Sequence, residues 1–287
     1  MSLEEETDRY QRQDQLVEAV KRGDIHQCQI ELNQWTAQSS TPFKPAKDLA
    51  PVLAAATSSK NTQMVSFLLH QGAPISSSDA LFALRGEDTE ATIALLQTFL
   101  DHGWDINGKT DIGKNILVHV IANETLTRWF LAHGADVNAI GKVGSTILDV
   151  AAANSSPAIF DLLVQHGARL EDSDALHSAA GARETKEGRV EMMKHLLDLG
   201  VFDVNALERR EYPPSRRRGR GTPLHNAVLS EDVERLRLLL AYGTDLEREN
   251  TMGETAEEFA ADRGFKISEA FLKDAAASKG RTENVGA

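Results

Sequence analysis

A phosphate-binding motif is the sharpest chemical signal in this 287-residue sequence. Residues Gly103 to Thr110 satisfy the pattern G-x-x-x-x-G-K-[ST], in which backbone amides at the start of a helix hold phosphate groups. That chemistry requires a buried strand before the loop and a helix after it. Here an apolar helical pattern from Ile93 to Asp101 enters the loop, and a turn-rich segment leaves it. The context therefore argues against nucleotide binding.

Nine histidines and one cysteine are the other candidates for metal or nucleophilic chemistry. His102, His133 and His166 each precede a glycine and recur at intervals of 31 and 33 residues. Stacked helices lie roughly 8–10 Å apart, whereas zinc holds its nitrogen ligands about 2 Å away. We therefore expect these rings to bind the last carbonyls of their own helices rather than one ion. Cys28 is predicted to be a core residue, and no catalytic residue, metal or cofactor is predicted.

A basic segment interrupts an otherwise acidic chain between Glu208 and Arg220. It carries six arginines against two glutamates, and these arginines are Arg209, Arg210, Arg216, Arg217, Arg218 and Arg220. Proline and glycine disfavour a regular helix there, so we expect a protruding loop. Bidentate guanidinium groups suit acidic peptides, phosphorylated segments, RNA or an import receptor. A solvated insertion that offsets the acidic surface is the alternative, and it is favoured because loops tolerate insertions.

A recurring glycine shows how these residues are positioned. It closes successive apolar helical patterns, and it stands at Gly72, Gly103, Gly134, Gly167, Gly200 and Gly243. The spacing is 31 to 33 residues until Gly200 and 43 residues after it, which locates one insertion. Each apolar helix is too short to bury its own face, so neighbouring units must stack to form a core. The period predicts one repeat domain.

Two stretches identify the repeat. Residues Gly221 to Ala227 read Gly-Thr-Pro-Leu-His-Asn-Ala, and residues His133 to Ala139 read His-Gly-Ala-Asp-Val-Asn-Ala. Together they resemble the beginning and the end of an ankyrin repeat. The resemblance implies an all-α repeat solenoid, an ankyrin-repeat array of helix-turn-helix units with finger hairpins or loops. It also implies that His177 and His225 are structural and hydrogen-bond between neighbouring units.

The ankyrin resemblance covers residues 14–275, with about seven to eight units and the insertion at 208–220. Residues 1–13 and 276–287 are polar or small, and we expect both to be disordered. The stretch from Trp35 to Lys47 reads as an irregular connector. Within it, Trp35 and Phe43 are expected to pack the connector onto the array rather than line a groove.

Composition narrows the class of protein. The net charge of −12 disfavours general nucleic-acid binding, because phosphate is repelled. The first residues lack the pattern of a signal peptide, and no apolar run is long enough to span a bilayer. With a single cysteine, the cytosol or nucleus is the expected compartment. The chain is expected to be a monomer.

The resemblance implies that the chain binds another protein, of unknown identity, on the concave face of fingers and first helices, as an adaptor, inhibitor or scaffold. The residues predicted to contact that partner are finger residues, namely Trp104, Lys109, Asp111, Ile112, Lys114, Ile140, Lys142 and Val143. Apolar fingers suit an interface core, and they equally suit packing of finger against finger. Tryptophan after the cap glycine is either packed or an exposed hot spot.

Two other classes of function remain open. One is an enzyme or small-ligand protein with a pocket in the irregular second and third units, which would need an enclosed cavity with converging polar groups. The other is binding of phosphate or nucleic acid by the arginine loop. That binding would fall steeply with salt and be lost when Arg216, Arg217 and Arg218 become alanine.

Overall fold

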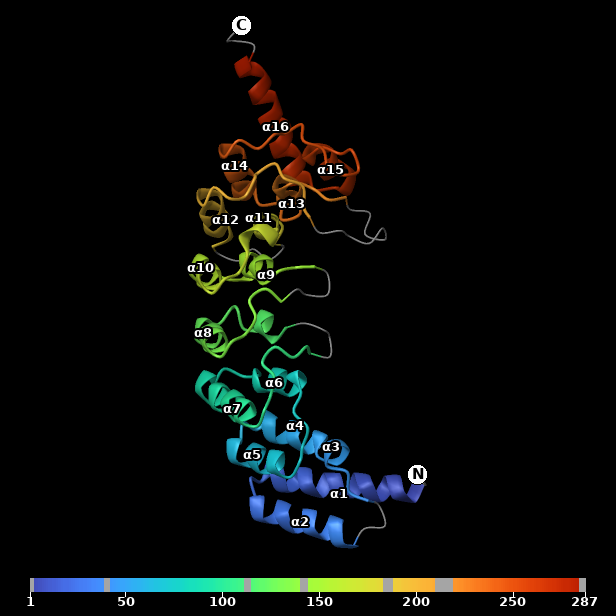
Figure 1. The fold of residues 1–287 in the computed structure, drawn as a ribbon. Coiled ribbons are helices and arrows are strands. Elements are labelled where there is room, and N and C mark those ends of the chain that lie inside the picture. The colour runs from blue at the N-terminus through green and yellow to red at the C-terminus, as the bar shows by residue number, and fades with distance from the viewer. Residues whose placement is uncertain are drawn as a thin grey trace. The chain divides into compact units, whose positions relative to one another are not determined.

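The computed structural model (Figure 1) describes residues 3–38, 42–110, 115–139, 144–182, 188–209 and 219–283. Secondary structure within these residues is helical, apart from an isolated antiparallel bridge between Lys109 and Asn115. The chain divides into two compact units. The first comprises residues 1–116 and 128–135, and the second comprises residues 117–127 and 136–287. The predicted all-α class is confirmed.

The first compact unit is built from short helices joined by turns. They are α1 (Leu3–Lys21), α2 (Ile25–Gln38), α3 (Pro45–Asp48), α4 (Ala50–Ser58), α5 (Thr62–His70), α6 (Ser77–Ala83), α7 (Thr89–Asp101) and part of α8 (Glu124–Ala132). Polar N-caps start several of them, because a side-chain oxygen satisfies an amide that has no partner within the helix. The Asn61 side chain accepts from the amide of Met64, and Ser76 forms a capping box with Asp79.

The start of the chain differs from the expected disordered segment 1–13. Helix α1 begins at Leu3, and Arg9 is buried. Its guanidinium donates to the buried carboxylate of Asp48 and to the carbonyl oxygen of Pro42. A polar helix is thus held by a partner 39 residues away, which local composition does not reveal.

The connector begins later than predicted, because α2 continues to Gln38. Trp35 is 1% exposed, and its ring centroid lies 5.3 Å from that of Phe43. The predicted packing of this aromatic pair is confirmed. Cys28 is also a core residue, as expected, and burial raises the pKa of its thiol to about 11.

The second compact unit repeats one helix pair (Figure 1). Its helices are α9 (Ile147–Asn154), α10 (Pro157–Gln165), η2 (Leu170–Asp172), α11 (Ala175–Ala180), α12 (Arg189–Asp198), α13 (Pro223–Val228), α14 (Val233–Ala241), α15 (Ala256–Arg263) and α16 (Lys266–Glu283). The helix η1 (Ile116–His119), like α8, crosses the boundary between the compact units. First helices α9, α11, α13 and α15 pack in series, and second helices α10, α12, α14 and α16 pack beside them.

Buried polar side chains join neighbouring repeats of this unit. Each donates to carbonyl oxygens at or just after the end of a preceding first helix or turn, where carbonyls lack helical partners. Arg189 donates to Ala152 at 2.6 Å, and Arg235 donates to Ala182 at 2.6 Å. Ser155 and Ser268 make the same kind of link with their hydroxyls, to Ile121 at 2.6 Å and Val228 at 3.2 Å.

The end of the chain also differs from the predicted disordered segment 276–287. Helix α16 continues to Glu283, and residues 284–287 lie outside the described part. The helix is held by Leu272, which is 1% exposed, and by the buried Ser268. Small residues in this stretch favour a helix as readily as a tail, since alanine has the best helix propensity.

Candidate functional site

Two residues of the predicted partner-binding set, Trp104 and Lys109, lie in the described part of the chain. Trp104 is 6% exposed, and its ring stands edge-on to Phe99 and Phe130 with centroids 6.3 Å away in each case. The packed alternative therefore holds for Trp104, whereas Lys109 is exposed. The other predicted residues lie outside the described residues, namely Asp111, Ile112, Lys114, Ile140, Lys142 and Val143.

The arginine segment is described only at its two ends. The amide of Arg209 donates to both carboxylate oxygens of Asp174 at 3.1 Å, and its side chain is exposed. Arg220 forms two hydrogen bonds with Thr251 through its backbone. The remaining members, Arg210, Arg216, Arg217 and Arg218, lie outside the described residues.

The phosphate-loop motif lies in the context that the sequence predicted. Helix α7 enters it, and Gly103, directly after the C-cap residue His102, has φ of +85°. The following residues to Thr110 form turns and one bridge position. The carbonyl of Gly108 accepts a hydrogen bond from Ser77 at 2.8 Å. Both glycines thus have structural roles in this repeat.

The histidines that precede the cap glycines behave as predicted. Their Nδ1 atoms donate to the carbonyl four residues earlier, at 2.8 Å for His102, 2.7 Å for His133 and 2.8 Å for His166. This arrangement places an imidazole at the partially negative end of each helix. Among the described residues, no group of three or more His, Cys, Asp or Glu side chains could hold a metal ion.

His177 and His225 hydrogen-bond to neighbouring repeats, as the resemblance implied. Both rings are buried, and their Nε2 atoms donate at 2.9 Å to the carbonyls of Ala206 and Glu254. Burial lowers the pKa of His177, so the ring is neutral at pH 7. These contacts give both histidines a structural role.

A groove of about 370 Å³ lies between two consecutive fingers of the second compact unit. It is lined by Leu170, Glu171, Ser173, Asp174, Leu176, His177, Val201, Phe202, Asp203, Ala206, Leu207 and Arg209. We call it the finger groove. Half of these side chains are apolar, and its volume falls within the roughly 300–1,000 Å³ of ordinary binding pockets.

The charges of the finger groove are unevenly distributed. Glu171 and Asp203 are exposed at its rim, and Asp174 is buried in its floor. Arg209 is the cation in the lining. His177 adds no charge, because it is neutral. The lining is therefore apolar and acidic, with one basic side chain.

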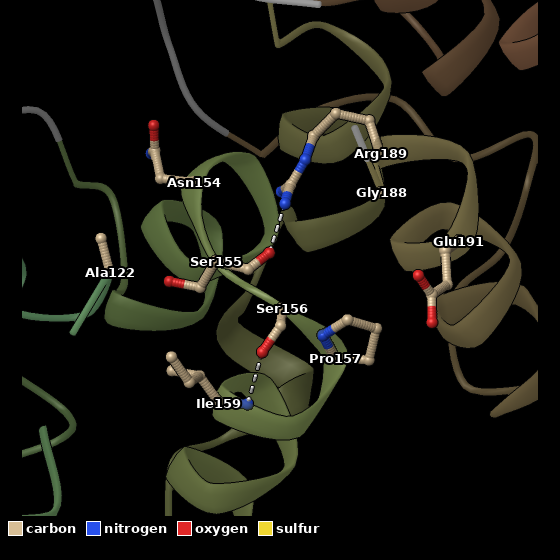
Figure 2. Close-up of a pocket in the computed structure, with 9 residues that line it drawn as sticks. All are labelled: Ala122, Asn154, Ser155, Ser156, Pro157, Ile159, Gly188, Arg189 and Glu191. Atoms are coloured by element: carbon tan, nitrogen blue, oxygen red, sulfur yellow. Dashed lines mark hydrogen bonds between the residues drawn. The ribbon is translucent and has the colours of Figure 1, made fainter. Parts of the chain in front are cut away.

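A second hollow, of about 620 Å³, lies at the start of α10 and α12 (Figure 2). The Ser155 hydroxyl and the Arg189 guanidinium both donate to backbone carbonyls, including a bond from Arg189 to Ser155. Ser156 caps α10 by accepting from the amide of Ile159 at 3.4 Å. The Ser155 hydroxyl and the two terminal nitrogens of Arg189 therefore already bind the backbone, and these bonds join neighbouring repeats.

Comparisons with known proteins identify the repeat. Residues 80–174 match the family model described as ankyrin repeats (3 copies). This part of the chain therefore consists of ankyrin repeats. It is 34% identical over 114 residues to ankyrin repeat and SOCS box protein 6 from Pongo abelii, and equally so to that from Homo sapiens. The crystal structure of the human ASB11 ankyrin repeat domain matches with a TM-score of 0.55 and 22% identity, over 77% of this chain and 95% of that chain.

The sequence matches cover part of each protein. They extend over 37% of this chain and 25% of each SOCS box relative, so the match spans a quarter of those relatives. Ankyrin repeats are a protein–protein interaction module and generally have no enzymatic role. Within the described residues, no helix combines the length and apolar character needed to cross a membrane.

One ankyrin repeat departs from the others directly after its closing glycine. In three repeats the second residue after that glycine is an aspartate whose carboxylate accepts from the amide two residues later, as in Asp105, Asp136 and Asp245. Asp203 makes the same turn, 2.8 Å from the amide of Asn205, but it is the third residue after Gly200. One residue is therefore inserted in this finger.

The insertion exposes Val201. In the other ankyrin repeats the residue after the closing glycine is 6–8% exposed, and its amide bonds the carbonyl five residues earlier, as for Ala73, Trp104, Ala135, Ala168 and Thr244. Val201 is 58% exposed, and its amide makes no such bond to the described Leu196. The spacing of the closing glycines alone does not reveal this insertion, whereas an alignment of the Asp-Val-Asn motifs would have revealed it.

Proposed function

We propose that this chain binds a partner protein on the face formed by its fingers and first helices. The finger groove, with Val201 exposed at its edge, is the observation that carries the proposal. Exposed apolar side chains beside a concave, mainly apolar surface are typical of interface cores. Adaptor, inhibitor and scaffold roles all fit binding of this kind.

The predicted finger residues belong to the proposal as well. Lys109 is exposed on its finger, and the finger set from Asp111 to Val143 remains part of the proposal. Charged residues around an apolar centre tune specificity and association rate more than affinity. The proposal takes the chain to act as a monomer in the cytosol or nucleus, which agrees with the buried free thiol of Cys28.

Site-specific photo-crosslinking tests the proposed face. A photoreactive phenylalanine would replace Lys109 or Val201 on the fingers, and Lys194 or Arg237 on second helices would serve as matched exposed controls. All four variants would be illuminated in an extract of the host cell. We expect protein adducts from the finger positions and none from the controls. Adducts of equal yield from the second helices would overturn the proposal.

A further inference from the structure

We propose that the finger groove binds a short partner segment in which an apolar side chain contacts Val201 and an adjacent lysine or arginine pairs with Glu171 and Asp203. This inference rests on the proposed protein-binding function and names the chemistry of the segment. It depends on the inserted residue of one repeat, so it predicts that this groove differs from the grooves of regular repeats.

The apolar part of the proposal follows from the inserted residue. Val201 is 58% exposed, whereas its counterparts elsewhere are buried, so a valine side chain faces solvent at the edge of the groove. Phe202, Leu207 and the buried Leu176 continue this apolar surface. Covering Val201 with a partner side chain removes apolar area from water, which is favourable in proportion to that area.

The basic part of the proposal follows from charge. Glu171 has no ion-pair partner among the described residues. The carboxylate of Asp203 accepts one hydrogen bond, from the amide of Asn205 in the same turn. Asp174 adds a third acidic group, and Arg209 is the one cation among the described residues that line the groove. The charges of this described lining favour a cation beside the apolar anchor and disfavour an acidic neighbour.

Panning a display library of random linear peptides against the 287-residue chain would identify the preferred segment. We expect selected peptides to share an apolar residue next to lysine or arginine. The consensus peptide would then be synthesised with a fluorophore, and its dissociation constant measured by fluorescence anisotropy. Val201→Asp should weaken binding about tenfold or more, because it places a charge where the apolar anchor sits.

Leu199→Asp is the matched control. Leu199 lies two residues from Val201, is 40% exposed and does not line the groove, so this change should leave the affinity unaltered. Glu171→Lys should weaken the consensus peptide, and a peptide with its basic residue changed to glutamate should recover affinity for that variant. Circular dichroism would verify that each variant is folded.

Three results would overturn the inference. They are a consensus without a basic residue, unchanged affinity of Val201→Asp, and failure of the charge exchange at Glu171. If finger crosslinks form while the peptide tests fail, the protein-binding function stands and the groove chemistry is wrong. If finger positions give no crosslinks either, the proposed function itself fails.

Discussion

The turns that close α10 and α12 belong to the same compact unit and differ by one residue. After α10, Gly167 has φ of +90°, and the amide of Ala168 bonds the carbonyl of Leu163 at 3.0 Å. After α12, Gly200 also has positive φ, but the next residue, Val201, is exposed. In the first turn an amide satisfies a carbonyl near the helix end, whereas the second turn leaves an apolar side chain exposed to solvent.

This difference shows how an ankyrin array acquires a local surface feature. The inserted residue lies between helices, so α12 still packs against α10 and α14. Asn205 still links to the next finger, since its side-chain oxygen accepts from the amide of Asp245 at 2.9 Å. Surface turns absorb insertions at small free-energy cost, which leaves the core unchanged.

The largest expected effect concerns Trp104 in the first compact unit, which follows Gly103 as Val201 follows Gly200. Replacing Trp104 by alanine should reduce the free energy of unfolding by about 3–5 kcal/mol, because a buried aromatic leaves a cavity. Urea denaturation followed by circular dichroism would measure the loss. Trp104→Phe should cost much less, since the indole N–H has no hydrogen-bond partner among the described residues. An alanine variant of unchanged stability would contradict the burial of this ring.

Equivalent charges placed in the two turns would test the comparison directly. Ala168→Asp should cost about 2 kcal/mol or more, because that side chain is 6% exposed and would bury an unpaired charge. Val201→Asp should change stability by less than about 0.5 kcal/mol, as exposed positions usually do. Thermal and urea unfolding of both variants would measure the contrast. Equal destabilisation would show that the two turns are packed alike.

Deleting Val201 should convert the turn after α12 into the regular form. We expect Phe202 to move into the position after Gly200 and the free energy of unfolding to change by less than about 1 kcal/mol, because a surface loop is shortened by one residue. Binding of the consensus peptide should be lost. Retained binding by a folded deletion variant, measured by anisotropy, would remove the role assigned to the insertion.

The smallest expected effect is a pH dependence at the floor of the finger groove. Burial lowers the pKa of His177 in the folded chain. When the pH falls below the ordinary histidine pKa of roughly 6.5, the unfolded chain therefore binds more protons than the folded chain. The stability contributed by neutral His177 is therefore present above that pH and is lost as the pH falls below it.

Urea unfolding of wild type and His177→Gln at about pH 7.5 and about pH 5.5 would isolate this contribution. The wild type should lose more stability on acidification than the glutamine variant, in which residue 177 does not titrate. Acid-titrating groups that do not interact with residue 177 affect both proteins equally. Identical pH dependence would mean that His177 is as accessible to protons when folded as when unfolded.

Much of the fold could be predicted from short-range patterns. The cap glycines have positive φ, which residues with side chains rarely adopt. Because of this constraint, the spacing of Gly103 and its counterparts predicted the repeat period. The roles of His177 and His225 were implied by the ankyrin resemblance, and each ring forms one hydrogen bond to the next repeat. The structure differs from the expectation at both chain ends, since Arg9 has a partner 39 residues away and α16 continues to Glu283.

The candidate site was less predictable, because exposure depends on what covers a side chain. Trp104 and Val201 both follow a cap glycine, yet one is 6% and the other 58% exposed. The sequence alone determined the repeat and the helix ends at the cap glycines, which follow from local backbone requirements, and its ankyrin resemblance implied the structural histidines. Only the tertiary structure decided that Trp104 is covered by Phe99 and Phe130 while Val201 faces solvent, because burial is a property of packed neighbours.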